Sequence, residues 1–227
     1  MYVRTVNDQT LTFGVSGKLW RDAMVMYDRE TNSTWAHVTG RAITGPLLDA
    51  QLETYPALQT TWKAWLAAYP ETKVLKKPVL YGSSYARYNA DPRRQGIHGR
   101  RMGRSLLPAK SKVIGFQLEE SPYAVPVQAL LPGSLTKLSV ADVPLLIFTD
   151  VAGEGVTLWQ REYEQEVLDF TLVDKDQPRA HTGDGRSFDL VTGEEAGGGP
   201  PLTRIQTTKA YWFGWHNFYP ETQVVSP

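Results

Sequence analysis

The chain has 227 residues, and 41% of them are hydrophobic, which is enough apolar material to bury an ordinary core. Lys plus Arg and Asp plus Glu each number 24, so the formal net charge is zero and a generally cationic, nucleic-acid-coating surface is excluded. The chain contains no cysteine, which excludes disulfides, thiolate metal sites and a cysteine nucleophile within it. No apolar run approaches the roughly 20 residues of a membrane helix, so no membrane span is predicted.

A period of two dominates the sequence and predicts short β-strands. The N-terminal stretch MYVRTVNDQTLTFG already alternates like a strand and lacks the basic start and apolar run of a signal peptide. Hairpin turns are expected at NDQ (7–9), SGK (16–18) and GDG (183–185). The predicted strands are Thr10–Val15, Ala23–Tyr27, Lys112–Leu118, Val143–Thr149, Val156–Arg161 and Val167–Val173.

Two short helices are predicted from the motif W-x-x-W-x-x-x-Y-P-E-T-x-V, which occurs twice with an offset of 150 residues. In the first copy, Trp62, Trp65 and Tyr69 lie at i, i+3 and i+7 on one helical face, with Thr60 or Thr61 as the N-cap. The following proline ends the helix, because the residue before proline is pushed out of the right-handed helical region.

The second copy places Trp212, Trp215 and Tyr219 in the same way. A helix of this length is marginal alone, so we expect each one to dock its aromatic face on the sheet of its own repeat. One further helical turn is expected near residues 126–131. Together with the strands, this predicts an α+β fold that is mainly antiparallel β.

A second shared phrase precedes each helix, at residues 33–47 and 187–200, with an offset near 153. Two ordered motifs at nearly constant spacing indicate internal duplication. We therefore predict two unequal homologous repeats, each ending in a Trp-rich helix: residues 1–80 are the C-terminal half of the first repeat and 112–227 the complete second repeat. Residues 81–111 form a connector between them.

The connector has no clear period and is strongly basic. Residues 81–112 contain eight Lys or Arg against Asp91 alone, whereas residues 154–176 are rich in Glu and Asp. We expect the connector to lie over an acidic face of its own molecule, with an anionic partner as the alternative.

The most suggestive polar cluster follows the strand that ends at Tyr27. In a tight hairpin, Asp28 and Arg29 point to opposite faces, so one of them is expected to face the sheet interior or a cleft. A buried charge needs a partner, and Arg41 or Asp49 are the nearby candidates. Two interpretations stay open: a turn-fixing ion pair, or a ligand site walled by Asp28, Arg29, Trp35 and Arg41.

The four histidines show no H-x-H or H-E-x-x-H spacing, so no single element presents a metal site, and no cofactor is predicted. They are His37, His98, His181 and His216. If the repeats pack about a pseudo-twofold axis, His37 and His181 could approach each other and Asp184 could join them. This hypothesis adds these three side chains to the candidate ligand-binding residues.

Four phrases together resemble an uncharacterised bacterial and archaeal family, domain of unknown function 3179. They are FGVSGKLWRDAMVMYDRET, STWAHVTGRAITGPL, TTWKAWLAAYPETKVL and YWFGWHNFYPETQVV. The resemblance implies a strand-rich segment with a Cys-Pro-x-Cys motif before the first phrase, which this chain lacks. In the second copy, Val113–Arg161 would take its place. Family members commonly look exported, which implies a periplasmic or cell-surface location, and the family supplies no activity.

We therefore expect an uncharacterised, non-catalytic binding or scaffold unit derived from an exported protein. Its partner is an unknown small molecule or protein, and not nucleic acid. The alternative is a metal- or redox-dependent enzyme of unknown reaction whose Cys-containing centre is missing from this chain. The sequence leaves open whether the protein is an enzyme.

Overall fold

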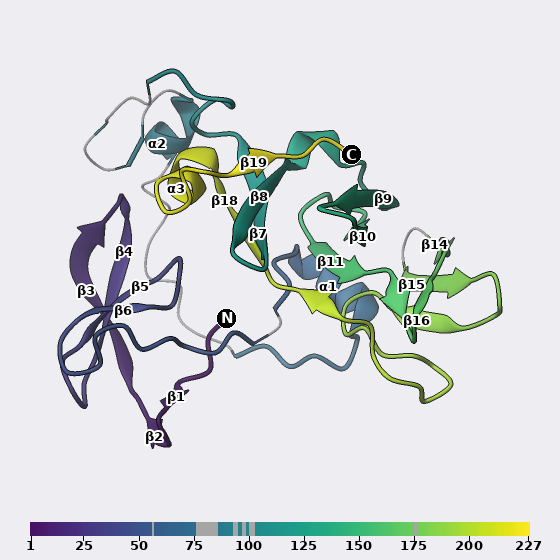
Figure 1. Ribbon diagram of the computed structural model, residues 1–227, viewed down its shortest axis with the longest axis horizontal. Helices are drawn as coiled ribbons and strands as arrows, with labels where there is room; N and C mark the ends of the chain where they lie inside the picture. The colour runs from purple at the N-terminus through teal and green to yellow at the C-terminus, as the bar shows by residue number, and fades with distance from the viewer. Residues whose placement is uncertain (56, 76–85, 93–94, 97–98, 100–102, 175–176) are drawn as a thin grey trace. The chain divides into compact units, whose positions relative to one another are not determined.

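The computed structural model describes residues 1–55, 57–75, 86–92, 95–96, 99, 103–174 and 177–227. Antiparallel sheets make up most of this part of the chain, and its α-helices are short (Figure 1). The predicted class, α+β with mainly antiparallel strands, is confirmed.

The N-terminal strands form a two-stranded ribbon and a four-stranded sheet, each in sequential order. The ribbon consists of β1 (Thr5–Val6) and β2 (Gln9–Thr10), and the sheet consists of β3 (Phe13–Trp20), β4 (Ala23–Asp28), β5 (Thr34–Ala36) and β6 (Ala42–Thr44).

Two further four-stranded sheets have the orders β18-β7-β8-β19 and β17-β11-β10-β9, and β19 pairs with β8 in parallel. Their strands are β7 (Lys112–Leu118), β8 (Ser121–Pro126), β9 (Ser134–Val140), β10 (Val143–Thr149), β11 (Val156–Gln160), β17 (Arg204–Ile205), β18 (Thr207–Tyr211) and β19 (Gln223–Val224).

A second ribbon and a three-stranded sheet follow β11 in the chain. They are formed by β12 (Glu162–Tyr163), β13 (Glu166–Val167), β14 (Phe170–Asp174), β15 (Gln177–Thr182) and β16 (Ser187–Asp189). The helices are α1 (Trp62–Ala68), α2 (Ala86–Ala90), α3 (Trp212–His216) and the 3-10 turn η1 (Val127–Ala129).

The strand predictions were most accurate where an apolar run is buried on both faces. The ranges predicted for Lys112–Leu118 and Val143–Thr149 are those of β7 and β10. The turn expected at SGK was wrong, because residues 16–18 lie inside β3, where the register with β4 shifts. The hairpin turns instead at Arg21 and Asp22, which both adopt positive φ.

The helix that begins at Trp62 follows its predicted signals. Thr61 is the N-cap, and its hydroxyl accepts a hydrogen bond from the Ala64 N–H at 3.3 Å. The helix ends at Ala68, two residues before the proline. Helix α2 was not predicted, because its five residues carry no apolar period.

The described residues form two compact units, and each is discontinuous in sequence. The first contains residues 1–57, 91–113 and 210–222, and the second contains 58–90, 114–209 and 223–227.

The core of the first unit is built around Trp35, which is fully buried. Leu11 and Leu52 are also buried there, and the rings of Phe13 and Trp35 meet edge to face with centroids 5.6 Å apart. An edge-to-face pair adds to the stabilisation that burial gives, because the positive ring edge meets the negative ring face.

The second unit has an apolar cluster on each face of β10. Leu145 and Ile147 belong to one cluster, and Leu146 and Phe148 belong to the other. Successive side chains of a strand point to opposite faces, so a continuous apolar run is what a strand covered on both sides requires.

The two Trp-rich helices have unlike surroundings. Trp212 and Trp215 of α3 are buried, whereas Trp62 of α1 is 51% exposed. Helix α1 belongs to the second unit and contacts β15, and α3 belongs to the first unit, where Phe218 meets Trp20 edge to face at 5.3 Å. The expectation that each helix docks on its own sheet was wrong, because helical spacing defines an apolar face without specifying which sheet receives it.

Candidate functional site

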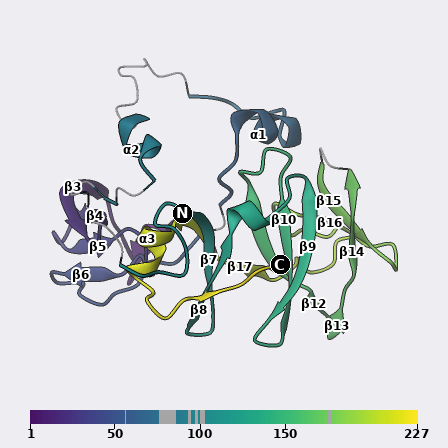
Figure 2. The ribbon, with the colours of Figure 1, turned by 90° about the horizontal axis from the view of Figure 1, so that it is seen from above.

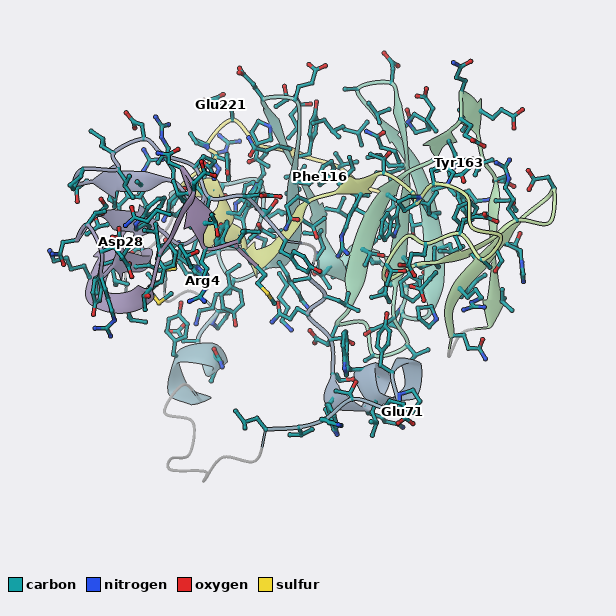
Figure 3. All side chains as sticks on the ribbon, turned by 90° about the horizontal axis from the view of Figure 1, so that it is seen from below. Arg4, Asp28, Glu71, Phe116, Tyr163 and Glu221 are labelled. Carbon is teal, nitrogen blue, oxygen red and sulfur yellow. The ribbon has the colours of Figure 1, made fainter. Side chains whose placement is uncertain are left out.

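Asp28 and Trp35, the central pair of the predicted polar cluster, do come together, inside the first unit. Asp28 is fully buried among the strands β3–β6 (Figure 3). Its carboxylate accepts hydrogen bonds from the Trp35 indole N–H at 2.9 Å and from the Thr31 backbone N–H at 2.6 Å. Burial opposes ionisation of Asp28, but these hydrogen bonds outweigh it and lower its pKa.

The other charged residues of the predicted cluster, and the candidate partners of its buried member, make their contacts elsewhere. Arg29 is exposed, with its guanidinium 5.8 Å from the centre of the Tyr27 ring. Arg41 pairs with Asp49 at 2.8 Å on the surface. Asp28 therefore holds the turn at Thr31 through hydrogen bonds to its buried carboxylate, and it forms no ion pair with the described residues. The ligand site walled by Asp28, Arg29, Trp35 and Arg41 stays a prediction.

The ligand site predicted from His37, His181 and Asp184 stays a prediction. His37, in the first unit, and His181, on β15 in the second, are both exposed. Asp184 forms an ion pair with Arg186 and accepts a hydrogen bond from the Thr182 hydroxyl. These bonds lower the pKa of Asp184. His98 lies outside the described residues, and so do four of the eight cationic residues of the basic connector.

A cavity in the second unit was not expected from the sequence. Its volume is about 710 Å³, and α1 lies beside the ends of β10 and β15 that help to enclose it (Figure 2). Most of its wall is apolar or aromatic, and it is lined by Leu58, Thr60, Thr61, Lys63, Ala64, Trp65, Ala67, Tyr69, Phe148, Asp150, Val151, Ala152, Pro178 and Val191. Cavities of this size and lining suit small organic ligands.

Asp150 is a buried carboxylate in the cavity wall and is 7% exposed. It lies two residues after Phe148, so strand alternation directs both side chains to the same face. The Asp150 carboxylate accepts hydrogen bonds from the Thr60 hydroxyl and, at 3.0 Å, from the Glu154 N–H. Its signal in the sequence is an acidic residue directly after a strand that is apolar except for its last residue, Thr149.

Tyr69 lines the same cavity at the end of α1. Burial and the negative charges of Asp189 and Glu194 raise its pKa to about 12. Its hydroxyl therefore keeps its proton at neutral pH and can donate a hydrogen bond.

Within the described residues, no group of three or more His, Asp or Glu side chains is arranged to hold a metal ion. No helix in this part of the chain has the length and apolar character needed to cross a membrane.

The fold and the cavity define a mainly antiparallel β protein with an apolar, small-molecule-sized cavity and a buried carboxylate in its wall. The family model described as "Protein of unknown function (DUF3179)" matches residues 1–222, so the chain belongs to this family, as the sequence phrases indicated. No curated protein and no solved structure matches the chain.

Proposed function

We propose that this chain is a non-catalytic binding unit of an exported protein, and that it binds a small organic molecule in the cavity beside α1. The cavity carries this proposal. It has the volume of a ligand site, a mainly apolar wall with aromatic side chains, and few polar groups to orient a ligand. The exported location rests on the family resemblance.

We also propose that the chain arose by internal duplication, with each copy ending in its Trp-rich helix. One support is the local geometry of the repeated motif. The Trp65 indole donates to the Thr72 hydroxyl at 3.0 Å, and the Trp215 indole donates to the Thr222 hydroxyl at 2.9 Å. The tyrosine four residues after each tryptophan tilts across the indole, with centroids 4.5 Å apart in one case and 4.3 Å in the other.

A second support comes from the strands that precede each helix. Two residues after a buried leucine, Phe13 packs edge to face on Trp35 with centroids 5.6 Å apart, and Phe170 packs on Phe188 in the same way at 5.7 Å. Further along, each segment has a glycine with positive φ whose carbonyl accepts a backbone hydrogen bond from a buried leucine. Leu52 donates to Gly40 and Leu202 donates to Gly193, both at 2.9 Å.

Binding at the cavity can be tested with N-phenyl-1-naphthylamine, a neutral apolar probe that fluoresces more strongly in apolar surroundings. The wild type is expected to enhance its fluorescence saturably. Ala64→Trp places an indole in the cavity wall and should weaken probe binding by about tenfold or more.

The matched control is Ala129→Trp, at an exposed residue of η1 that does not line the cavity. It should bind the probe like the wild type, and thermal unfolding should show that both variants are folded. Absence of saturable enhancement by the wild type, or equal binding by the two variants, would overturn the proposed site.

A further inference from the structure

We propose that the cavity beside α1 is selective for organic amines, with Asp150 binding the ammonium group and the aromatic wall holding the apolar body. This inference rests on the proposed binding function and names the class of ligand for the same site.

The state of the Asp150 carboxylate is the first argument. Its two oxygens offer about four acceptor positions. The hydrogen bonds from the Thr60 hydroxyl and the Glu154 N–H use two of them. None of the described lysines, arginines or histidines forms an ion pair with this carboxylate. A buried carboxylate without a counter-charge favours a cation at its remaining acceptor positions.

The local backbone makes room for this carboxylate. A Cβ atom built on Gly155 would lie 2.5 Å from Asp150 Oδ2 and 3.2 Å from the Thr60 Cβ. Glycine at position 155 therefore allows the carboxylate and its Thr60 partner to pack against the loop. Gly155→Ala should shift the carboxylate without removing its charge.

The aromatic wall is the second argument. Trp65, Tyr69 and Phe148 all line the cavity, and the negative faces of aromatic rings attract ammonium groups. The cationic lining residue Lys63 is exposed on α1, so its ammonium group can stay in water. The wall thus combines the negative charge of the buried Asp150 with aromatic rings that attract a cation.

The test compares three probes of nearly equal size: 4-phenylbutylamine, 4-phenylbutanol and 4-phenylbutanoate. Binding is measured at pH 7 by calorimetry with the full chain. The amine should bind about tenfold or more tightly than the alcohol, and the carboxylate weakest. Asp150→Asn should weaken amine binding by about tenfold more than it weakens alcohol binding, because it removes the negative charge while keeping an acceptor oxygen and a similar volume.

Gly155→Ala provides a second variant, which should weaken amine binding while alcohol binding persists. Unfolding midpoints near that of the wild type would show that both variants are folded. If amine and alcohol bind equally well, or if Asp150→Asn has no effect on amine binding, the amine selectivity is wrong while the binding function stands. Tightest binding of the carboxylate would also overturn the selectivity and would implicate Lys63. Failure of all three probes to bind would contradict the proposed function itself.

Discussion

Asp28 and Asp150 are buried carboxylates with opposite surroundings. Asp28 lies in a sealed core and accepts hydrogen bonds from Trp35 and Thr31, so its charge is used to fix a turn. Asp150 lines a cavity and accepts hydrogen bonds from the Thr60 hydroxyl and the Glu154 N–H. An aspartate is therefore structural in the first unit, whereas we propose that the one in the second unit binds a ligand.

We predict that Asp28→Asn lowers the free energy of unfolding by about 2 kcal/mol, because it turns an amide NH₂ toward buried N–H donors. The control Asp49→Asn, at the exposed ion pair with Arg41, should cost less than about 1 kcal/mol. Urea unfolding at pH 7 measures both losses. Equal losses in the two variants would contradict the structural role of Asp28.

The pH dependence has a definite sign. The pKa of Asp28 is lowered in the folded state from its ordinary value of 3.8. The stability that ionised Asp28 gives to the folded state is therefore complete above pH 3.8. It is lost as the pH falls through the lower pKa of the folded state. The difference in stability between the wild type and Asp28→Asn should narrow below about pH 4.

The two Trp-rich helices show how one local motif serves in different environments. Each motif forms the same indole-to-threonine hydrogen bond and the same tilt of tyrosine on tryptophan. Trp215 is 2% exposed, whereas Trp65 is only partly buried and lines the cavity. Helix α3 is thus a core element, and α1 forms one wall of the proposed site.

This difference predicts unequal effects of the same substitution. Trp215→Phe should cost about 2–3 kcal/mol, because it removes a buried hydrogen bond and leaves a small void. Trp65→Phe should cost about 1 kcal/mol or less, since its site is open to water and relaxes more easily. Urea unfolding compares the two variants, and a larger loss for Trp65→Phe would contradict the assignment of core and wall.

At the scale of the whole molecule, neither unit is a continuous piece of sequence. The segment carrying α3 belongs with the N-terminal strands, and the segment carrying α1 belongs with the strands after residue 114. Each unit therefore depends on a segment from the other half of the chain. Long connections permit this arrangement, because the entropy of closing a loop grows slowly with its length.

We predict that residues 112–227 expressed alone are less stable than the full chain, although the sequence predicts that they form a complete repeat. This fragment lacks the rest of the first unit, including Ser105, which accepts a hydrogen bond from the buried Trp212, and Trp20, which packs on Phe218. Urea unfolding should show a lower midpoint, and adding residues 1–80 as a second fragment should raise it. A fragment with the midpoint of the full chain would contradict this interdependence.

The fold class and several elements could be predicted from the sequence, since they depend on local patterns. The run Val143–Thr149, apolar up to Phe148, is typical of a strand that is buried on both faces. The Thr61 cap defines the start of α1. The burial of either Asp28 or Arg29 also followed from strand alternation. The true partners of Asp28 could not be predicted, because an indole N–H and a backbone N–H satisfy a carboxylate as well as an arginine does.

By itself, the sequence determined the antiparallel β class, the two helix-forming motifs and the family, because periodicity, capping and shared phrases are properties of short stretches of chain. Only the tertiary structure decided which strands each helix joins, and that Asp150, its partner Thr60 and three aromatic side chains line one cavity. The hydrogen bond from Thr60 to Asp150 alone links residues 90 positions apart. Side-chain packing between distant segments selects such contacts, and no local pattern encodes that choice.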